Sequence, residues 1–359
     1  MIVQKLKMYN FRCFSSFEIS FSNRVNILIG QNATGKTSVL EALNYLALTK
    51  SFRTNDEYQL IKEKQYEMSV IGEIVKESSI HFCKIIRQIK GKQVSKDNYR
   101  YSKISEYLGE ILVVSFTNSD MLNLLGTIRE RRKIIEPIIC QISKFYTDEC
   151  NSYKKLLNER NALLKRLIFE KNDKMIKLLR IIDLQIVNCA KNIISKRDIF
   201  IKKVNKKIKE YHLQISENKE ILEIKYVPSV SSEDFFKKLN SCLEEDLKRG
   251  STSYGPHKDD YVFIINNKNI TLYGSQGQQR SSLISTKLAF VEILKEEKGE
   301  YPILLLDDVL SDLDRNRQNN IFQLLNKNVQ TLVSSSTLSE LDDCIKDKAK
   351  IITLEKEMG

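Results

Sequence analysis

The sequence predicts an α/β fold built from both ends of the chain, with a mainly α-helical domain inserted between them. Three observations support this prediction. An apolar run, a glycine-containing loop and a helical pattern follow one another within residues 25–48. Four aliphatic residues and then two acids form a second strand pattern at residues 303–308. Apolar residues recur at helical spacing from about Arg129 to Ile215.

The loop at residues 30–38 fits the phosphate-binding pattern G-x-x-x-x-G-K-[ST]. Gly30 and Gly35 let the backbone curl so that its N–H groups face a phosphate. Lys36 can reach the β and γ phosphates, and the Thr37 hydroxyl can ligate Mg²⁺. A strand pattern precedes the loop and a helix pattern follows it, as the motif requires. We therefore predict that a nucleoside triphosphate binds at Gly30, Gln31, Asn32, Ala33, Thr34, Gly35, Lys36, Thr37 and Ser38.

A buried parallel strand is predicted to end at two adjacent acids, Asp307 and Asp308. Ligands bind at the carboxyl edge of the sheet in α/β folds, so both carboxylates should face the nucleotide. We expect Asp307 to support Mg²⁺ and Asp308 to orient or deprotonate the attacking water.

A second candidate anion site lies at the start of a predicted helix, at Ser275, Gln276, Gly277 and Gln278. An ordinary helix cap is the simpler interpretation. A second phosphate-binding helix end far along the sequence suggests that two copies of the chain enclose the nucleotide between them.

Short strands are predicted before and after the loop. We expect Val3–Tyr9, then Phe17–Phe21 leading into Val25–Ile29, and a partly antiparallel sheet after residue 68 with turns near Gly91 and Asn98. A buried strand is expected at Ile111–Phe116. Arg12 lies between two early strands. It is interpreted either as a surface arginine or as a residue that contacts the nucleotide.

The apolar spacing in the middle of the chain predicts two helices, separated by residues 171–174, that pack as an antiparallel hairpin. Arg160 and Arg197 each interrupt an apolar seam, so we expect packing there to be imperfect or shared with a partner. Eight basic residues and one acid lie between Lys191 and Lys209. They form either a solvated helix face or a surface that follows DNA phosphates.

Composition favours a reduced, intracellular, nucleic-acid-binding protein. The net charge is +12, and residues 116–249 hold 28 basic and 19 acidic residues. The seven cysteines are scattered without a C-x-x-C pair, which argues against a disulfide framework or zinc site. No apolar run approaches the length of a membrane span, and the charged start does not resemble a secretory signal. We expect a cytoplasmic protein.

Taken together, the motifs resemble an ABC-type P-loop ATPase head of the SMC/Rad50-like branch, and within it the RecF family of bacterial recombination mediators. The resemblance runs over residues 1–354 and includes the segments at 6–12, 113–116, 129–133 and 159–165. Residues 255–260, Gly-Pro-His-Lys-Asp-Asp, are similar to the family's G-P-H-R-D-D. It implies a head with a mixed sheet and an antiparallel β subdomain, formed by residues 1–115 and 250–359. Residues 116–249 would form the inserted helical arm.

By this resemblance the chain is expected to be an ATP-dependent homodimer that binds double-stranded DNA near single-strand gaps. It would act with RecR and RecO to help load RecA in repair, replication and the SOS response. Residues Ser275 to Gln279 would touch the γ-phosphate of the other subunit, and Asp312 and Asp314 would form a turn that acts in trans. The alternatives are a transporter's ATP-binding subunit and an SMC-like structural protein.

Two departures from the family pattern, at position 34 and at residues 118–120, affect these expectations, and so does Asp308, which is itself family-like. Thr34 stands where the family often has Gln, a change that the backbone loop should tolerate. Asn118-Ser119-Asp120 replaces a more usual P-E-D, which makes a water or metal contact from that segment doubtful. Asp308 stands where many relatives have glutamate, and its side chain is one methylene shorter. We therefore expect slow hydrolysis, with ATP acting mainly as a switch for dimerisation.

Overall fold

The computed structural model describes residues 1–170, 172–309, 318, 328–338 and 346–355. The chain divides into two compact units. The first unit contains Met1–Leu122, Lys207–Ile221 and Ser275–Gly359, and the second contains Asn123–Lys206 and Leu222–Gly274. The predicted head and arm boundaries, at 115/116 and 249/250, remain a prediction. Asp312 and Asp314 lie outside the described residues.

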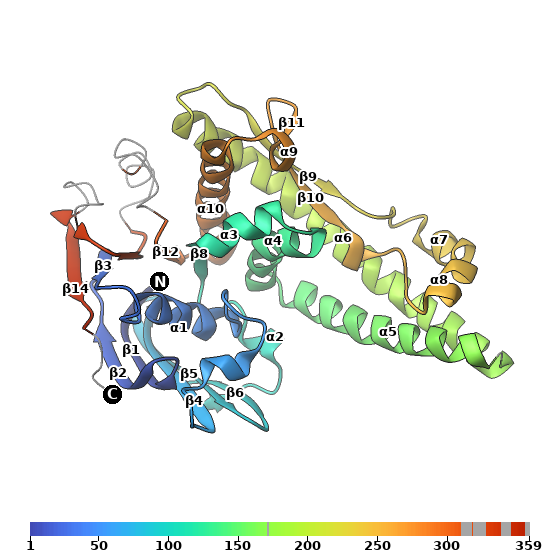
Figure 1. The fold of residues 1–359 in the computed structure, drawn as a ribbon, viewed down its shortest axis with the longest axis horizontal. Coiled ribbons are helices and arrows are strands. Elements are labelled where there is room, and N and C mark those ends of the chain that lie inside the picture. Colours follow the sequence, from blue (N-terminus) through green and yellow to red (C-terminus); the bar gives the residue numbers. More distant parts are fainter. Residues whose placement is uncertain (171, 310–317, 319–327, 339–345, 356–359) are drawn as a thin grey trace. The chain divides into compact units, whose positions relative to one another are not determined.

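A five-stranded parallel sheet forms one layer of the first unit, in the order β14-β3-β13-β12-β8 (Figure 1). Its strands are β3 (Val25–Ile29), β8 (Val113–Thr117), β12 (Ile303–Asp307), β13 (Thr331–Ser335) and β14 (Ala349–Thr353). All five residues of β12 and of β13 are buried, which explains their aliphatic composition. The register places Asp307 beside Thr117 on one side and Ser334 on the other. The predicted strand with its terminal acid is confirmed.

A six-stranded antiparallel sheet forms the second layer of this unit, in the order β2-β1-β4-β5-β6-β7. Its strands are β1 (Ile2–Phe11), β2 (Phe14–Ser20), β4 (Glu67–Lys76), β5 (Ser79–Gln88), β6 (Gly91–Lys96) and β7 (Tyr99–Arg100). Gly91 and Asn98 lie at its hairpin turns, as predicted. The three early strands are also confirmed, although β2 and β3 belong to different sheets.

Helix α1 (Lys36–Leu48) packs against strands of both sheets, so it forms the centre of the first unit. Residues Ser38 to Ala47 are all buried in it. The unit also contains η1 (Glu57–Leu60), α2 (Ile104–Tyr107) and α10 (Gln276–Lys298), and α3 (Asn118–Leu125) begins in it. The apolar side chains of α10 are buried, including Leu283 and Leu294.

The second unit is mainly helical. Its helices are α4 (Ile128–Ile142), α5 (Lys144–Phe169), α7 (Phe235–Ser241), α8 (Leu243–Arg249), η2 (Pro256–Lys258), α9 (Ile270–Tyr273) and most of α6 (Asp173–Ile215). A three-stranded antiparallel sheet, β11-β10-β9, was not predicted; its strands are Lys268–Asn269, Asp260–Ile265 and Leu222–Val227.

The predicted hairpin of two long helices is confirmed by contacts between α5 and α6 (Figure 1). Asn192 donates to Glu149 at 3.0 Å, and Arg160 donates to Asp183 at 2.7 Å. Residue numbers rise along one helix as they fall along the other, so the two helices run antiparallel.

The expectation that packing at Arg160 and Arg197 is shared with a partner is wrong, because both side chains are buried within the chain, although Nη2 of Arg160 has no hydrogen-bond partner among the described residues. Arg160 is fully buried, and its guanidinium donates to Asp183, to Asp246 at 2.6 Å and to Thr252 at 2.9 Å. A buried charge is tolerated when it is paired and hydrogen-bonded, which is the case here. The two breaks in the apolar pattern are therefore internal ion-pair sites of this unit.

Arg197 makes the second such site, and it explains the segment Gly255–Asp260. Its guanidinium donates to the Asp259 carboxylate at 2.9 Å, to Glu136 at 2.5 Å and to the Pro256 carbonyl at 2.8 Å. Asp260 at the end of the same segment accepts two hydrogen bonds of 2.7 Å from Arg131. The segment holds the second unit together through buried charges.

Candidate nucleotide site

The phosphate loop connects β3 to α1, and its two predicted glycines occupy positions where a side chain does not fit. A Cβ at Gly30 would lie 2.5 Å from the carbonyl oxygen of Leu354. Gly35 has a φ of 96°, and a Cβ there would lie 2.4 Å from the Phe14 ring. Because L-residues avoid this φ and neither contact is allowed, both positions require glycine.

Lys36 points back into the loop. Its ammonium group donates to the carbonyl oxygens of Gly30 at 2.5 Å and Gln31 at 3.0 Å. The Thr34 hydroxyl also donates to Gln31, at 3.0 Å, and closes the loop from inside. Residues 31–33 are exposed at its crown, and Ser38 is buried in α1. Threonine at position 34 thus fits the loop through a local hydrogen bond.

Thr37 and Asp307 meet at the carboxyl edge of the parallel sheet. The Thr37 hydroxyl donates to the Asp307 carboxylate at 2.9 Å, and the Ser334 hydroxyl donates to the same oxygen at 2.8 Å. Burial raises the pKa of the Asp307 carboxyl, whereas these two hydrogen bonds lower it. Ser334, at the end of β13, is a site residue that we did not predict, although its strand ends in a run of hydroxyl side chains.

The Thr37 and Asp307 oxygens fit the requirements of Mg²⁺. This ion prefers oxygen ligands, and proteins supply it with one or two while phosphates and waters complete the shell. No group of three or more His, Cys, Asp or Glu side chains that could hold a metal alone occurs in the described part of the chain. The pair suits a metal that arrives with the nucleotide.

Asp308 is exposed directly after the buried Asp307. Its φ of 55° lies in the left-handed region, and its N–H group donates to the Ser334 hydroxyl at 3.0 Å. Aspartate tolerates this backbone conformation better than most residues. The turn therefore separates the two carboxylates, with one in the interior and the other at the surface.

The segment 118–120 begins helix α3, next to the end of β8. The Asp120 carboxylate accepts from the Thr117 N–H group at 2.9 Å and from the Lys287 ammonium group of α10 at 2.8 Å. Ser119 donates to the carbonyl oxygen of Phe52. Asp120 is thus held by an almost fully buried ion pair beside the strand that carries Asp307.

Arg12 is anchored to helix α1. Its guanidinium donates to both carboxylate oxygens of Glu41, at 2.8 and 2.6 Å, and to the carbonyl oxygen of Gln59 at 2.9 Å. The Glu41 side chain is fully buried, so the pair replaces the hydration that the carboxylate has lost. Sequence reasoning missed Glu41, although an acid within an apolar helix is a recognisable signal. The predicted nucleotide contact of Arg12 remains a prediction.

The second predicted segment forms the amino-terminal end of α10. The Ser275 hydroxyl accepts from the Gln278 N–H group at 3.2 Å, and the Gln278 side chain accepts from the Ser275 N–H group at 2.9 Å. This is a capping box. Ser275 and Gln276 are exposed, whereas Gly277 and Gln278 are half-buried. Among the described residues, no hydrogen bond or ion pair joins Ser275–Gln278 to the phosphate loop.

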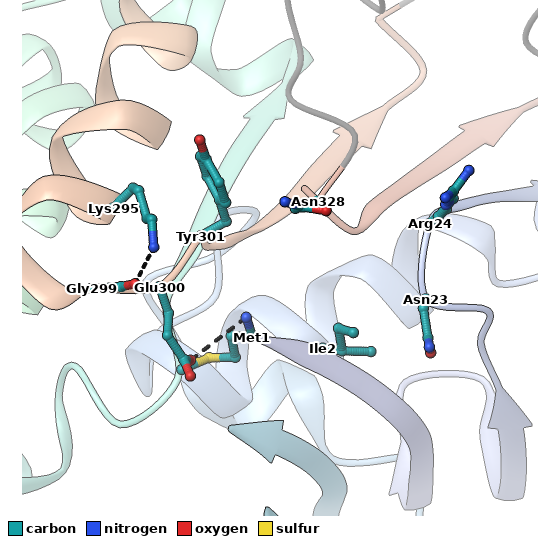
Figure 2. A pocket seen from close by; sticks show the side chains of 9 residues that line it. All are labelled: Met1, Ile2, Asn23, Arg24, Lys295, Gly299, Glu300, Tyr301 and Asn328. Carbon is teal, nitrogen blue, oxygen red and sulfur yellow. Dashed lines mark hydrogen bonds and ion pairs between the residues drawn. The ribbon is translucent and has the colours of Figure 1, made fainter. Parts of the chain in front are cut away.

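A cavity of about 530 Å³ lies at the opposite edge of the parallel sheet, where β3 and β12 begin (Figure 2). Its lining includes Met1, Arg24, Glu300 and Tyr301. Figure 2 shows the Glu300 carboxylate directed toward the Met1 amino group, which lies 3.6 Å away. None of the predicted site residues lines this cavity.

The parallel sheet, the phosphate loop and the adjacent acid define a nucleotide-binding head of the RecF/RecN/SMC class. The chain matches the family described as RecF/RecN/SMC N terminal domain over residues 2–358. It is 37% identical over 350 residues to the DNA replication and repair protein RecF of Pediococcus pentosaceus, covering 94% of this chain and 93% of that protein. It is 38% identical to RecF of Lachnoclostridium phytofermentans, with coverage of 95% and 94%.

Solved structures agree with this assignment. A structure described as the recombination mediator protein RecF with ATP, in the RecFOR pathway, superposes with a TM-score of 0.88 at 30% identity, covering 95% of this chain and 93% of that one. The Smc head domain of Pyrococcus furiosus has a TM-score of 0.53 at 17% identity, which shows a shared fold. The chain belongs to the RecF family, and the predicted fold class and family are confirmed.

None of the helices in the described ranges is both long enough and apolar enough to cross a membrane.

Proposed function

We propose that this chain is an ATP-dependent DNA-binding recombination mediator whose two copies close on ATP. Near full-length similarity to proteins named DNA replication and repair protein RecF supports this proposal. A similar solved structure is described as RecF with ATP, which supports ATP as the nucleotide. The protein would act in the cytoplasm, in repair, replication and the SOS response.

The observation that carries the proposal is the exposed, capped start of α10, which belongs to the same unit as the phosphate loop. Ser275 is exposed at this helix end, and the helix dipole there favours an anion. A second copy could therefore place its own Ser275 against the γ-phosphate held by the loop, with Asp312 and Asp314 nearby.

Each residue of the loop side has a role in this proposal. Lys36 leaves the carbonyl oxygens of its own loop and neutralises phosphate charge. Thr37 and Asp307 would hold Mg²⁺, which screens the phosphate oxygens when it is bound. Asp308, exposed and close by, would accept a proton from water. Its short side chain favours slow hydrolysis, so ATP would act mainly as a switch.

Duplex DNA would bind along the exposed basic face of α6. Lys191, Lys202, Lys206 and Lys209 are all exposed, and their spacing places them along one side of the helix. Lysines on a helix neutralise phosphates without reading sequence, which suits a protein that acts on DNA of any sequence. The proposed preference for gap junctions, and the action with RecR and RecO to load RecA, come from the family.

Sedimentation with ATP, ADP or no nucleotide tests the proposal. We expect dimers with ATP and monomers with ADP. Lys36→Arg should reduce ATP-dependent dimerisation while leaving the fold intact. Ser275→Arg should block dimerisation while ATP still binds the monomer, because the phosphate loop is untouched. Equal monomer content with ATP and ADP in the wild-type protein would overturn the proposal.

A DNA-binding titration tests the basic face. Affinity for duplex DNA should fall steeply as salt rises, because each neutralised phosphate releases counterions. A variant with Lys202, Lys206 and Lys209 changed to glutamine should bind more weakly and with a shallower salt dependence. An unchanged salt dependence in this variant would place the DNA elsewhere.

A further inference from the structure

The start of α10 is fixed by a residue from the segment that follows α6. Both ends of the Gln278 side-chain amide are occupied. Its oxygen accepts from the Ser275 N–H group at 2.9 Å, and its nitrogen donates to the Glu220 carboxylate at 2.8 Å. A glutamine held at one end only can rotate its amide, whereas this one is held in a single orientation. Glu220 therefore determines how Gln278 completes the cap.

Glu220 is in turn oriented by His212, a fully buried residue near the end of α6. The imidazole Nε2 lies 3.2 Å from the second carboxylate oxygen of Glu220, and Nδ1 lies 3.0 Å from the Ser285 hydroxyl of α10. A carboxylate oxygen can only accept, so Nε2–H donates to Glu220. One carboxylate oxygen of Glu220 thus accepts a hydrogen bond from the end of α6, and the other accepts one from the start of α10.

The loop after α6 is built to bring Glu220 back to this position. The Asn218 N–H group donates to the carbonyl oxygen of Leu213 at 2.7 Å, which ends the helix. Glu217 and Asn218 both have positive φ values, of 53° and 61°, so the chain reverses sharply there. The Glu220 N–H group then donates to the Ser216 hydroxyl at 3.2 Å. The backbone at Glu220 is therefore held as firmly as its side chain.

We propose that Glu220, oriented by His212, is a positioning residue for the Ser275–Gln278 segment and sets the geometry in which that segment meets the γ-phosphate of the partner copy. This inference rests on the proposed function, because it assumes that Ser275 completes a shared nucleotide site. Glu220 itself does not contact the nucleotide in this proposal. It acts through Gln278 and the capping box.

The same contacts join α6 to α10. In addition to Glu220 and His212, Lys207 of α6 forms an ion pair of 2.6 Å with Glu296 of α10. The exposed lysines proposed to bind DNA lie on this same continuous helix.

Three variants test the role of Glu220. Glu220→Ala removes both contacts. Glu220→Gln keeps an oxygen for Gln278 and turns its NH2 group toward Nε2 of His212, which can accept once the imidazole proton moves to Nδ1 and faces the Ser285 hydroxyl. Glu217→Ala is the matched control, because Glu217 is exposed in the same loop and its carboxylate forms an ion pair of 2.6 Å with Lys219. Two properties are measured for each full-length variant. They are dimerisation with a non-hydrolysable ATP analogue, and hydrogen exchange of residues 275–285 without nucleotide.

We expect Glu220→Ala to weaken dimerisation about tenfold or more, as the loss of a hydrogen bond to a charged group does. Exchange at the start of α10 should become faster in the same variant. Glu220→Gln should stay close to wild type, and Glu217→Ala should be indistinguishable from it. Binding of the ATP analogue to monomeric protein should be unchanged in all three, because the phosphate loop is untouched.

Wild-type behaviour of Glu220→Ala in both measurements would overturn the inference. A loss that Glu220→Gln shares in full would also overturn it, because the hydrogen bonds would then not be the cause. If the wild-type protein itself stays monomeric with the ATP analogue, the proposed function fails. The exchange measurement still decides, in that case, whether Glu220 holds the start of α10.

Discussion

The Thr37 hydroxyl donates a 2.9 Å hydrogen bond to the Asp307 carboxylate, across 270 residues of sequence. This contact joins the phosphate loop to the end of β12, so two distant motifs share one site. It also places two oxygen ligands at the sheet edge where a phosphate-bound Mg²⁺ would lie.

Replacing Thr37 by valine tests that site. The substitution keeps the shape of the side chain and removes the hydroxyl, so Mg²⁺ loses one oxygen ligand. We expect ATP affinity in the presence of Mg²⁺ to fall about tenfold, as for loss of one hydrogen-bonding group to a charge. Affinity without Mg²⁺ should change much less. Titration of a fluorescent ATP analogue with and without Mg²⁺ measures both, and equal losses in the two conditions would contradict the assignment.

Replacing Arg160 by methionine tests the buried ion pairs of the second unit. The change leaves Asp183 and Asp246 buried without their cation. We expect the free energy of unfolding to fall by about 3–5 kcal/mol. Lys155→Met is the control on the same helix, because Lys155 and Glu159 are exposed and 4.0 Å apart, and it should change stability by less than about 0.5 kcal/mol. Urea denaturation followed by circular dichroism measures both, and similar losses for the two variants would contradict the prediction.

The pH dependence of stability should reveal His257. Its Nδ1 accepts from the Tyr153 hydroxyl at 2.7 Å, and its Nε2 faces the carbonyl oxygen of Thr252 at 3.2 Å. Burial lowers the pKa of His257 from 6.5 to about 4. The unfolded chain therefore takes up a proton near pH 6.5, whereas the folded chain does so only near pH 4. The stabilisation is complete above pH 6.5 and is lost as the pH falls toward 4.

His257→Gln removes this titration while the amide can keep both hydrogen bonds. Between pH 7 and pH 4, the free energy of unfolding of the variant should fall by about 3 kcal/mol less than that of the wild-type protein. Urea denaturation at a series of pH values gives the two curves. If the curves run parallel, His257 is not a source of the acid sensitivity.

Arg12→Ala distinguishes the two interpretations of that arginine. In this variant the buried Glu41 carboxylate would keep its hydrogen bond from the Ser51 hydroxyl but lose both hydrogen bonds from Arg12. We expect a loss of about 2 kcal/mol in the free energy of unfolding. ATP affinity is then measured well below the melting temperature. An affinity close to wild type would identify Arg12 as a structural tie, whereas unchanged stability with a large loss of affinity would identify a nucleotide contact.

The motifs carried by local spacing were predictable from the sequence. The phosphate loop needs Gly30, Gly35 and Lys36 at fixed intervals, and β12 needs consecutive aliphatic residues before Asp307. The long helices were visible because apolar residues recur every three or four positions. Each of these signals lies within a few turns of helix or one strand, so no tertiary information was needed.

Partners that come from distant segments were not predictable. In the sequence, Arg160 only interrupts an apolar seam. Its partner Asp246 lies 86 residues later, so the ion pair is seen only in the structure. Glu220 looks like a solvated acid, and although Glu41 stands out within an apolar helix, nothing near either residue in sequence identifies Gln278 or Arg12 as its partner. The sheet of the second unit was missed for a similar reason. Strands β9 and β10 are short, and the turn-rich residues between them in sequence hid their pairing.

Strand β3, which leads into the phosphate loop, lies between β13 and β14, and both neighbours come from near the carboxyl end of the chain. During synthesis, β3 therefore acquires its two neighbouring strands only after residues 331–353 have left the ribosome. The phosphate loop is made early, but the sheet that carries it is completed late.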